Sequence, residues 1–218
     1  VYSSIDRMGR YAYGAQPRIA LWNLTRLAEA MLPLLAEDEG AAIAEAEEAL
    51  AGFRPRFQQA YETGLMRKLG LFTTREGDAA LATTILEAVA ENQVDFTLFF
   101  RRLADAQVAG TGDAALRSMF QDTVACDALL ARWRERLTHE RQDTVSRRSA
   151  MRAVNPAYIP RNHQIERMII AAVEQDDFTR MAELLTVLSL PYEDQPQFVR
   201  YAEPPQPHEQ VTATFCGT

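Results

Sequence analysis

Apolar side chains recur at helical spacing along most of the chain. Pro17 suits the first position of a helix, where its missing N–H is not needed, and Pro33 should kink or end that helix. From Ile19 onward the apolar positions follow helical spacing, namely Ile19, Leu21, Trp22, Leu24, Leu27, Ala28, Met31 and Leu35. The sequence contains no strand-period run of convincing length and no internal repeat. The pattern predicts an all-α chain.

Capping residues and glycines divide the rest of the sequence into further helices. Asp38 caps an Ala/Glu-rich run, Gly70 ends another helix, and Asp95 opens a helix with a phenylalanine stripe. Gly110-Thr111-Gly112 lacks the lysine and the preceding strand of a phosphate-binding loop, so it is interpreted as a helix break. The predicted helices cover residues 39–50, 57–69, 79–93, the segment after Asp95, a segment from Asp122 or Thr123 to Leu137, 162–175 and 178–188.

Three parts with different composition follow from this pattern. Residues 1–16 show no helical period and contain two glycines, so they are expected to form a loop. Residues 17–190 form the predicted helical domain, interrupted by a stiff connection at Asn155-Pro156 and Ile159-Pro160. Residues 191–218 contain five prolines and are expected to form an extended tail over the surface.

Composition and charge narrow the class of protein. The chain of 218 residues has a net charge of −7, which disfavours binding to nucleic acid and to an anionic membrane. No run of eighteen apolar residues predicts a membrane-spanning helix. Two cysteines are too few for a disulfide framework, which indicates a reducing, cytoplasmic setting. Because the sequence begins at Val1 in mid-pattern, we interpret it as part of a longer protein.

The candidate chemistry of the chain is sparse. No Ser/His/Asp or Cys/His nucleophile arrangement is present, and the histidines (His139, His163 and His208) lack metal-ligand spacing. The acidic run from Glu37 to Glu48 is interpreted as a solvated helix face. The larger aromatic residues are predicted to be core, namely Trp22, Phe96, Phe99, Phe100 and Trp133. We therefore expect no catalytic residue, no metal site and no bound cofactor in this chain.

One segment, residues 132–167, is locally basic. Guanidinium groups suit phosphate and carboxylate partners, so this face could hold an anionic partner. Ion pairing within the chain, with its acidic helices, is the favoured interpretation. Charge reversal of Arg147 and Arg148 distinguishes the two hypotheses. The arginines of the segment are 132, 134, 136, 141, 147, 148, 152, 161 and 167.

Three separated stretches resemble blocks of the selenoprotein O family, in matching order and distance from the chain end. The first contains Gly9-Arg10-Tyr11-Ala12-Tyr13, Gln16-Pro17, Trp22-Asn23-Leu24 and Arg26-Leu27-Ala28. The second contains Asn155-Pro156, Tyr158-Ile159 and Arg161-Asn162. The third contains Leu184-Leu185, Val187-Leu188, Pro191-Tyr192, Gln195-Pro196, Tyr201 and Pro204-Pro205.

The resemblance implies a protein adenylyltransferase on a protein-kinase-like fold, which transfers AMP from ATP to Ser, Thr or Tyr of protein substrates with Mg²⁺ or Mn²⁺. In that family the ATP-binding, catalytic and metal-binding residues precede the Gly-Arg-Tyr block, so none of them maps onto this chain, and Asp6 is not taken as a metal ligand. The chain resembles the end of the activation segment (1–16) followed by the helical C-lobe and a helical extension. Its implied partners are the N-terminal kinase-like part of its own protein and protein substrates.

The resemblance also implies two candidate sites. Gly9, Arg10, Tyr11, Gln16 and Pro17 would help to shape the protein-substrate site. Cys216 stands third from the end, where some family members have selenocysteine and others cysteine, so it is either a redox residue or an inert exposed thiol. A truncated C-lobe should expose apolar surface where its partner lobe belongs. The alternative to an adenylyltransferase part is a non-catalytic helical interaction or regulatory module.

Overall fold

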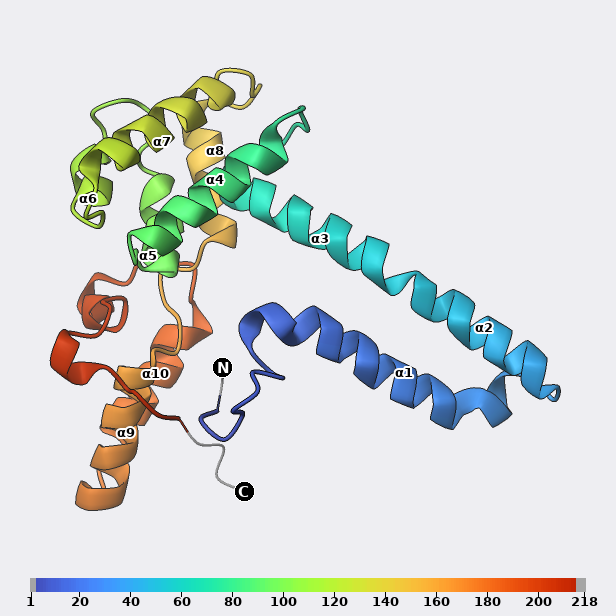
Figure 1. Ribbon diagram of the computed structural model, residues 1–218. Helices are drawn as coiled ribbons and strands as arrows, with labels where there is room; N and C mark the ends of the chain where they lie inside the picture. Colours follow the sequence, from blue (N-terminus) through green and yellow to red (C-terminus); the bar gives the residue numbers. More distant parts are fainter. Residues whose placement is uncertain (1–2, 215–218) are drawn as a thin grey trace. The chain divides into compact units, whose positions relative to one another are not determined.

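A computed structural model describes residues 3–214, and over this range the chain forms helices and no strand (Figure 1). The all-α prediction is therefore confirmed. In chain order the elements are η1 (Tyr13–Ala15), α1 (Gln16–Leu35), α2 (Glu39–Ala51), α3 (Phe53–Lys68), α4 (Asp78–Glu91), α5 (Phe96–Leu103), α6 (Asp113–Arg117), α7 (Thr123–Leu137), α8 (Thr144–Val154), α9 (Asn162–Gln175), α10 (Thr179–Ser189), η2 (Pro196–Tyr201) and η3 (Pro207–Glu209).

Side-chain caps explain where several helices begin. Asp38 accepts a hydrogen bond from Ala41 N at 2.9 Å, and Asp95 accepts one from Leu98 N at 2.9 Å. These bonds satisfy backbone donors that have no partner inside the helix. Pro33 lies inside α1, which ends two residues later at Leu35. Gly77, with a φ of 89°, occupies the N-cap of α4.

Helix α8 is absent from the prediction. Its N-cap is Asp143, whose carboxylate accepts hydrogen bonds from Val145 N and Ser146 N, both at 2.9 Å. The helix buries Arg147 and Met151 on one face. Because one of the two buried side chains is an arginine, the apolar period of this helix is weak in the sequence.

The chain divides into two compact units, the first comprising residues 1–62 and 211–218 and the second residues 63–210. In the first unit α1 and α2 pack along each other as a helical hairpin (Figure 1). Near the chain ends, Ser4 N donates to Thr214 O at 2.6 Å and Thr214 N donates to Ser4 Oγ at 3.0 Å. The boundaries at residues 16 and 190, between the predicted loop, helical domain and tail, stay a prediction.

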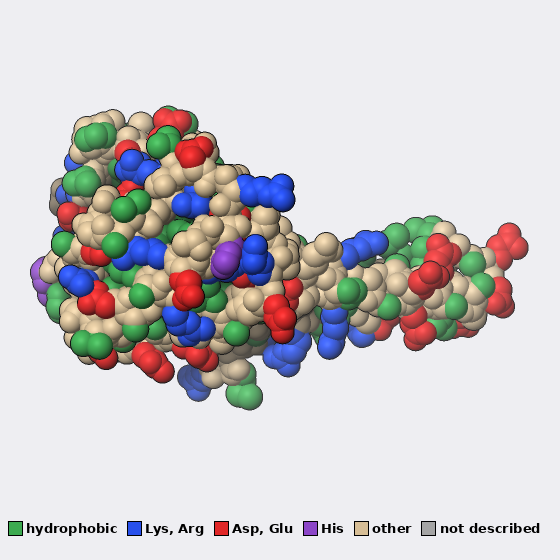
Figure 2. Space-filling view, turned by 90° about the horizontal axis from the view of Figure 1, so that it is seen from above, with side chains coloured by type: hydrophobic (Ala, Val, Ile, Leu, Met, Phe, Trp, Pro, Cys, Tyr) green, Lys and Arg blue, Asp and Glu red, His purple; other side chains and the backbone are tan. Residues whose placement is uncertain are grey.

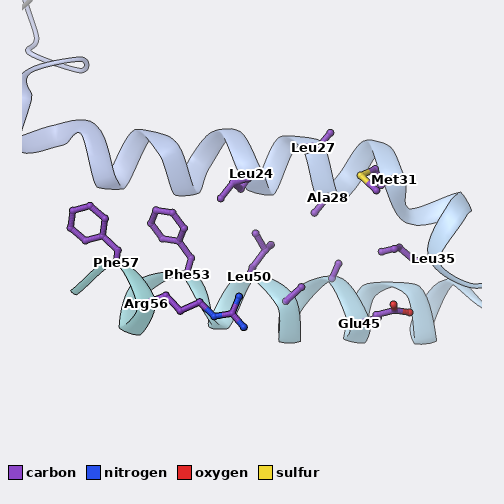
Figure 3. A pocket seen from close by; sticks show the side chains of 12 residues that line it. Leu24, Leu27, Ala28, Met31, Leu35, Glu45, Leu50, Phe53, Arg56 and Phe57 are labelled. Carbon is purple, nitrogen blue, oxygen red and sulfur yellow. The ribbon is translucent and has the colours of Figure 1, made fainter. Parts of the chain in front are cut away.

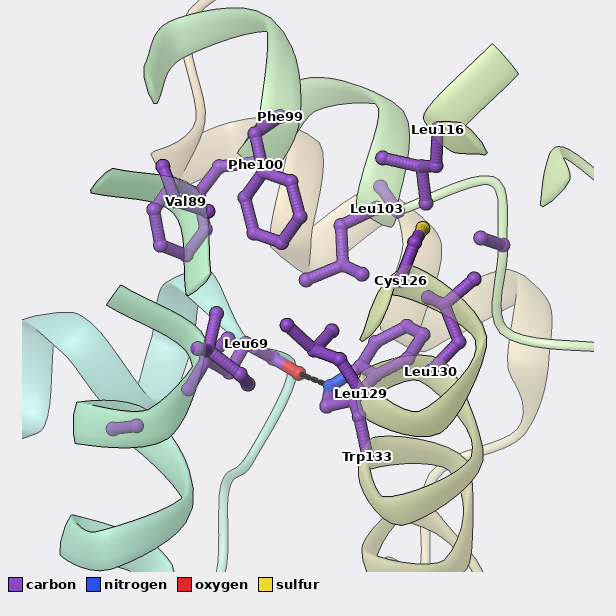
Figure 4. Packing of buried hydrophobic residues seen from close by; sticks show 14 of the residues in the cluster. Leu69, Val89, Phe99, Phe100, Leu103, Leu116, Cys126, Leu129, Leu130 and Trp133 are labelled. Atoms are coloured by element: carbon purple, nitrogen blue, oxygen red, sulfur yellow. Dashed lines mark hydrogen bonds between the residues drawn. The ribbon is translucent and has the colours of Figure 1, made fainter. Parts of the chain in front are cut away.

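The second unit has its main core among α4 to α8 and the end of α3 (Figure 4). Trp133 is fully buried there, and its indole N–H donates to Leu69 O at 2.8 Å. Phe99 and Phe100 lie edge to face with ring centroids 5.2 Å apart. The core prediction is confirmed for these three aromatic residues. It is wrong for Trp22 and Phe96, which are each 46% exposed.

A smaller apolar cluster joins α9, α10 and the C-terminal segment. The tail was predicted to be extended, but it forms two 3-10 turns, η2 and η3, each with proline in its first positions. Proline favours such starts because its φ is already near the helical value. Tyr201 of η2 is buried, and the Gln195 side chain donates to Val187 O at 3.0 Å.

Candidate functional site

A tight loop before α1 contains the five candidate substrate-site residues, and Asp6 organises it. The Asp6 carboxylate accepts hydrogen bonds from Arg10 N at 2.9 Å and from Tyr11 N at 2.8 Å. Gly9 has a φ of 64°, in the left-handed region that favours glycine, and this turn brings the two amides to the carboxylate. Asp6 thus organises the loop, a role that no motif in the sequence predicts.

The loop is joined to helix α1 by Gln16. Its side-chain amide donates to Tyr11 O at 2.6 Å, which fixes the backbone between the two motifs. Pro17 follows in the first turn of α1, where its missing N–H leaves no intrahelical bond unmade. The structure therefore brings Gly9, Arg10, Tyr11, Gln16 and Pro17 together at one loop–helix junction.

Arg10 lies against an aromatic side chain of α1. Its guanidinium carbon lies 4.6 Å from the centroid of the Trp22 ring, a cation–π distance. A hollow of about 530 Å³ opens beside this pair, and Arg18 and Ile19 also line it. Trp22, predicted as core, is instead a partly exposed platform at this hollow.

The charge of this junction is unbalanced. Arg10 and Arg18 make no ion pair with any residue between 3 and 214 that the structure describes. The carboxylate nearest in sequence, that of Asp6, is already engaged by backbone N–H groups. Two guanidinium groups beside an open hollow can therefore accept a carboxylate or phosphate group of a ligand.

Arginines of the basic segment, in contrast, are mostly neutralised within the chain. Arg161 pairs with the N-cap Asp95 at 2.7 Å, and Arg152 pairs with both Asp105 and Asp194. Arg147 is buried and donates to the amide oxygen of Gln107 at 2.5 Å. Further pairs join Arg134 to Asp113, Arg136 to Asp78 and Glu140, Arg148 to Asp105, and Arg167 to Glu209. The ion-pairing interpretation is confirmed for the six arginines that pair with aspartates and glutamates outside the acidic run of α2. Arg147 is satisfied by neutral groups instead.

Metal-binding and thiol chemistry find little support in the described part of the chain. Across residues 3–214 no three His, Cys, Asp or Glu side chains lie close enough together to hold a metal ion. Burial lowers the pKa of His163, whose ring Nε2 lies 3.1 Å from the Gln164 amide nitrogen. Burial also raises the pKa of Cys126 to about 11, so its thiol is not reactive. Cys216 lies outside the described residues.

The glycine pair between α5 and α6 closes a turn. Gly110 N donates to the Asp113 carboxylate at 3.0 Å, and Gly112, with a φ of 74°, caps α6. A Cβ at Gly112 would lie 3.0 Å from the backbone of Asp105. The interpretation of this stretch as a helix break is confirmed. Among the described helices, none is both long enough and apolar enough to cross a membrane.

Comparisons with known proteins identify similar chains. A family model described as protein adenylyltransferase SelO matches residues 1–189. A protein nucleotidyltransferase YdiU from Rhodopseudomonas palustris (strain BisB18) is 58% identical over 219 residues, which cover 100% of this chain and 44% of that protein. A YdiU protein from Methylorubrum extorquens (strain PA1) is 58% identical over 223 residues, covering 100% of this chain and 45% of that protein. The chain thus spans less than half the length of these curated relatives.

Proposed function

Because the chain belongs to the protein adenylyltransferase SelO family, we propose that it is the C-terminal helical part of an enzyme that transfers AMP from ATP to hydroxyl side chains of proteins. The match over residues 1–189 is the observation that carries this proposal. The proposed enzyme works in the cytoplasm on Ser, Thr or Tyr of its protein substrates.

The chemistry at the phosphate is assigned to the part of the longer protein outside this chain. Such transfer depends on positioning and on a divalent cation, Mg²⁺ or Mn²⁺, that stabilises charge on the phosphate. The described residues do not fit that cation, because they bring no cluster of acidic or histidine ligands together. The glycine pair Gly110 and Gly112 offers no cradle for the phosphates of ATP, since it closes a turn. No reaction step is therefore assigned to residues 3–214, and their proposed role is to support a kinase-like catalytic lobe.

The loop–helix junction is the proposed contact for protein substrates. Asp6 and Gln16 fix its backbone, and Arg10 and Arg18 present uncompensated positive charge beside the hollow. We expect this junction to favour substrate segments that carry acidic side chains close to the modified hydroxyl. In the full-length protein, Arg10→Ala should raise the KM for the protein substrate and leave the KM for ATP unchanged. Arg132→Ala, an exposed arginine of the second unit, is the matched control.

Mass spectrometry of reacted protein tests the activity itself. Full-length protein incubated with ATP, Mg²⁺ and a cell extract should add AMP, and not phosphate, to serine, threonine or tyrosine of other proteins. If the full-length protein added only phosphate, the proposed AMP transfer would be contradicted and kinase activity would be the function. Absence of any adduct, together with absence of ATP binding, would leave the non-catalytic helical module as the function.

A further inference from the structure

Helices α1 and α3 carry many more large apolar side chains than they bury. Ile19 is the buried residue of α1, and α3 has none. Leu27 is 53% exposed, Tyr61 47% and Phe57 38%. A helix of a folded domain normally packs its apolar face against another element, so both helices have a face whose packing partner is missing.

The two exposed faces meet in one groove (Figure 3). It has a volume of about 540 Å³ and lies between α1 and the junction of α2 with α3. Leu24 and Ala28 line it from α1, and Phe53 and Phe57 line it from α3. The Phe53 and Phe57 rings stack with centroids 6.1 Å apart, and the Phe57 and Tyr61 rings stack with centroids 6.2 Å apart. Stripes at this spacing on two helices suit the apolar face of a third helix.

We propose that this groove is the seat of an apolar segment from the N-terminal part of the same polypeptide. The relatives are more than twice as long as this chain, which covers 44% of one of them. A segment joined to the chain competes at an effective concentration near millimolar, far above that of a free partner. The inference rests on the length of the relatives and on the groove, and it does not depend on AMP transfer.

Other occupants fit the surface less well. Acidic side chains gather over the end of the α1–α2 hairpin (Figure 2), and Glu45 lines the groove itself. An anionic membrane would be repelled by this charge. A second copy would bring the same acidic hairpin and would have to bind from dilute solution, so it is an outcome of the test and not the proposal.

Thiol labelling of the full-length protein locates the buried surface. Leu27→Cys and Phe57→Cys place thiols at the groove, and Val124→Cys, at a position 76% exposed in α7, is the matched control. Rates are measured without ATP, and the rate of the unsubstituted protein is subtracted. We expect the thiols at 27 and 57 to react at least about tenfold more slowly than the thiol at 124, at every protein concentration. Circular dichroism checks that each variant is folded.

Two results would overturn the proposal. Equal rates at all three positions would mean that the groove stays open in the full-length protein. Protection that appears only at high concentration, together with a dimeric mass, would assign the groove to a second copy. Measuring AMP transfer on the same samples keeps the two proposals apart, because an open groove in an active enzyme contradicts only this one.

Discussion

Arg136→Met tests whether buried ion pairs stabilise the core of the second unit. Arg136 lies on α7 with its side chain 9% exposed. Its Nε donates to Asp78 Oδ1 at 2.5 Å and its Nη1 to Glu140 Oε1 at 2.8 Å. The two carboxylate side chains are 6% and 1% exposed. Methionine keeps most of the volume of the side chain and removes the charge.

The size of the effect follows from what the two carboxylates retain. Removing one partner of a buried ion pair costs about 3–5 kcal/mol, because an uncompensated charge is left behind. Asp78 still accepts from Arg75 N at 2.8 Å, and Glu140 from Phe72 N at 3.1 Å. These bonds reduce the penalty, so we expect a loss of about 3 kcal/mol, the lower end of the range.

Amide hydrogen exchange of α4 and α7 peptides in increasing urea measures this loss in the full-length protein. Arg132→Met is the matched control, because Arg132 is exposed on the same helix and makes no ion pair with a described residue. It should change the opening free energy by less than about 0.5 kcal/mol. If Arg136→Met lowered that free energy no more than Arg132→Met, the reasoning would be refuted.

Lowering the pH should reduce the difference in stability between the unsubstituted protein and Arg136→Met. Burial acts to raise the pKa of Asp78 and of Glu140, but hydrogen bonds outweigh it and leave each pKa below its ordinary value of 3.8 or 4.5. Arg136 donates to both groups. A lowered folded-state pKa gives stability that is present above the unfolded-state pKa and lost as the pH falls through the folded-state pKa. The unsubstituted protein should therefore lose more stability than Arg136→Met when the pH falls below about 4.5.

Three further outcomes are expected. Gly70→Ala should lower the free energy of unfolding by about 1–3 kcal/mol, because Gly70 has a φ of +73° and a Cβ would lie 2.7 Å from Met151 Sδ. Gly77→Ala, at a φ of +89° with no atom within 4 Å, should cost less in the same urea titration. Asp6→Ala should speed hydrogen exchange at the two backbone amides that donate to its carboxylate by at least about tenfold. Unchanged exchange rates would contradict the proposal that Asp6 organises the loop. Cys126, 1% exposed and with its pKa raised to about 11 by burial, should react with iodoacetamide at pH 8 only after urea unfolds the protein, and rapid reaction in the folded state would contradict its burial.

Helix boundaries with local signals were predictable from the sequence. Asp38 and Asp95 cap their helices through bonds to amides three residues away, and the structure places α9 at the predicted residues 162–175. Helix α8 has such a cap too, at Asp143, but its inward face contains Arg147. That arginine is satisfied by a residue forty positions away, which no local pattern reveals.

The candidate site could be located but not built from the sequence. The Gly-Arg-Tyr and Gln-Pro motifs mark the loop, whereas the role of Asp6 depends on the turn at Gly9 that brings two amides to one carboxylate. Trp22 was assigned to the core because its spacing is helical. In the structure the Trp22 ring lies against Arg10 instead. Helical spacing predicts which side of a helix is apolar, but it does not predict which element packs against that side.

Label transfer from ATP tests the central claim most directly. The full-length protein and this 218-residue chain are incubated in parallel with α-labelled ATP and Mg²⁺ or Mn²⁺, and protein-bound label is counted. The account predicts stable label on protein with the full-length enzyme and none with the chain alone. Label produced by the chain alone would contradict the assignment of the chemistry to the rest of the protein. No label from either would contradict AMP transfer itself.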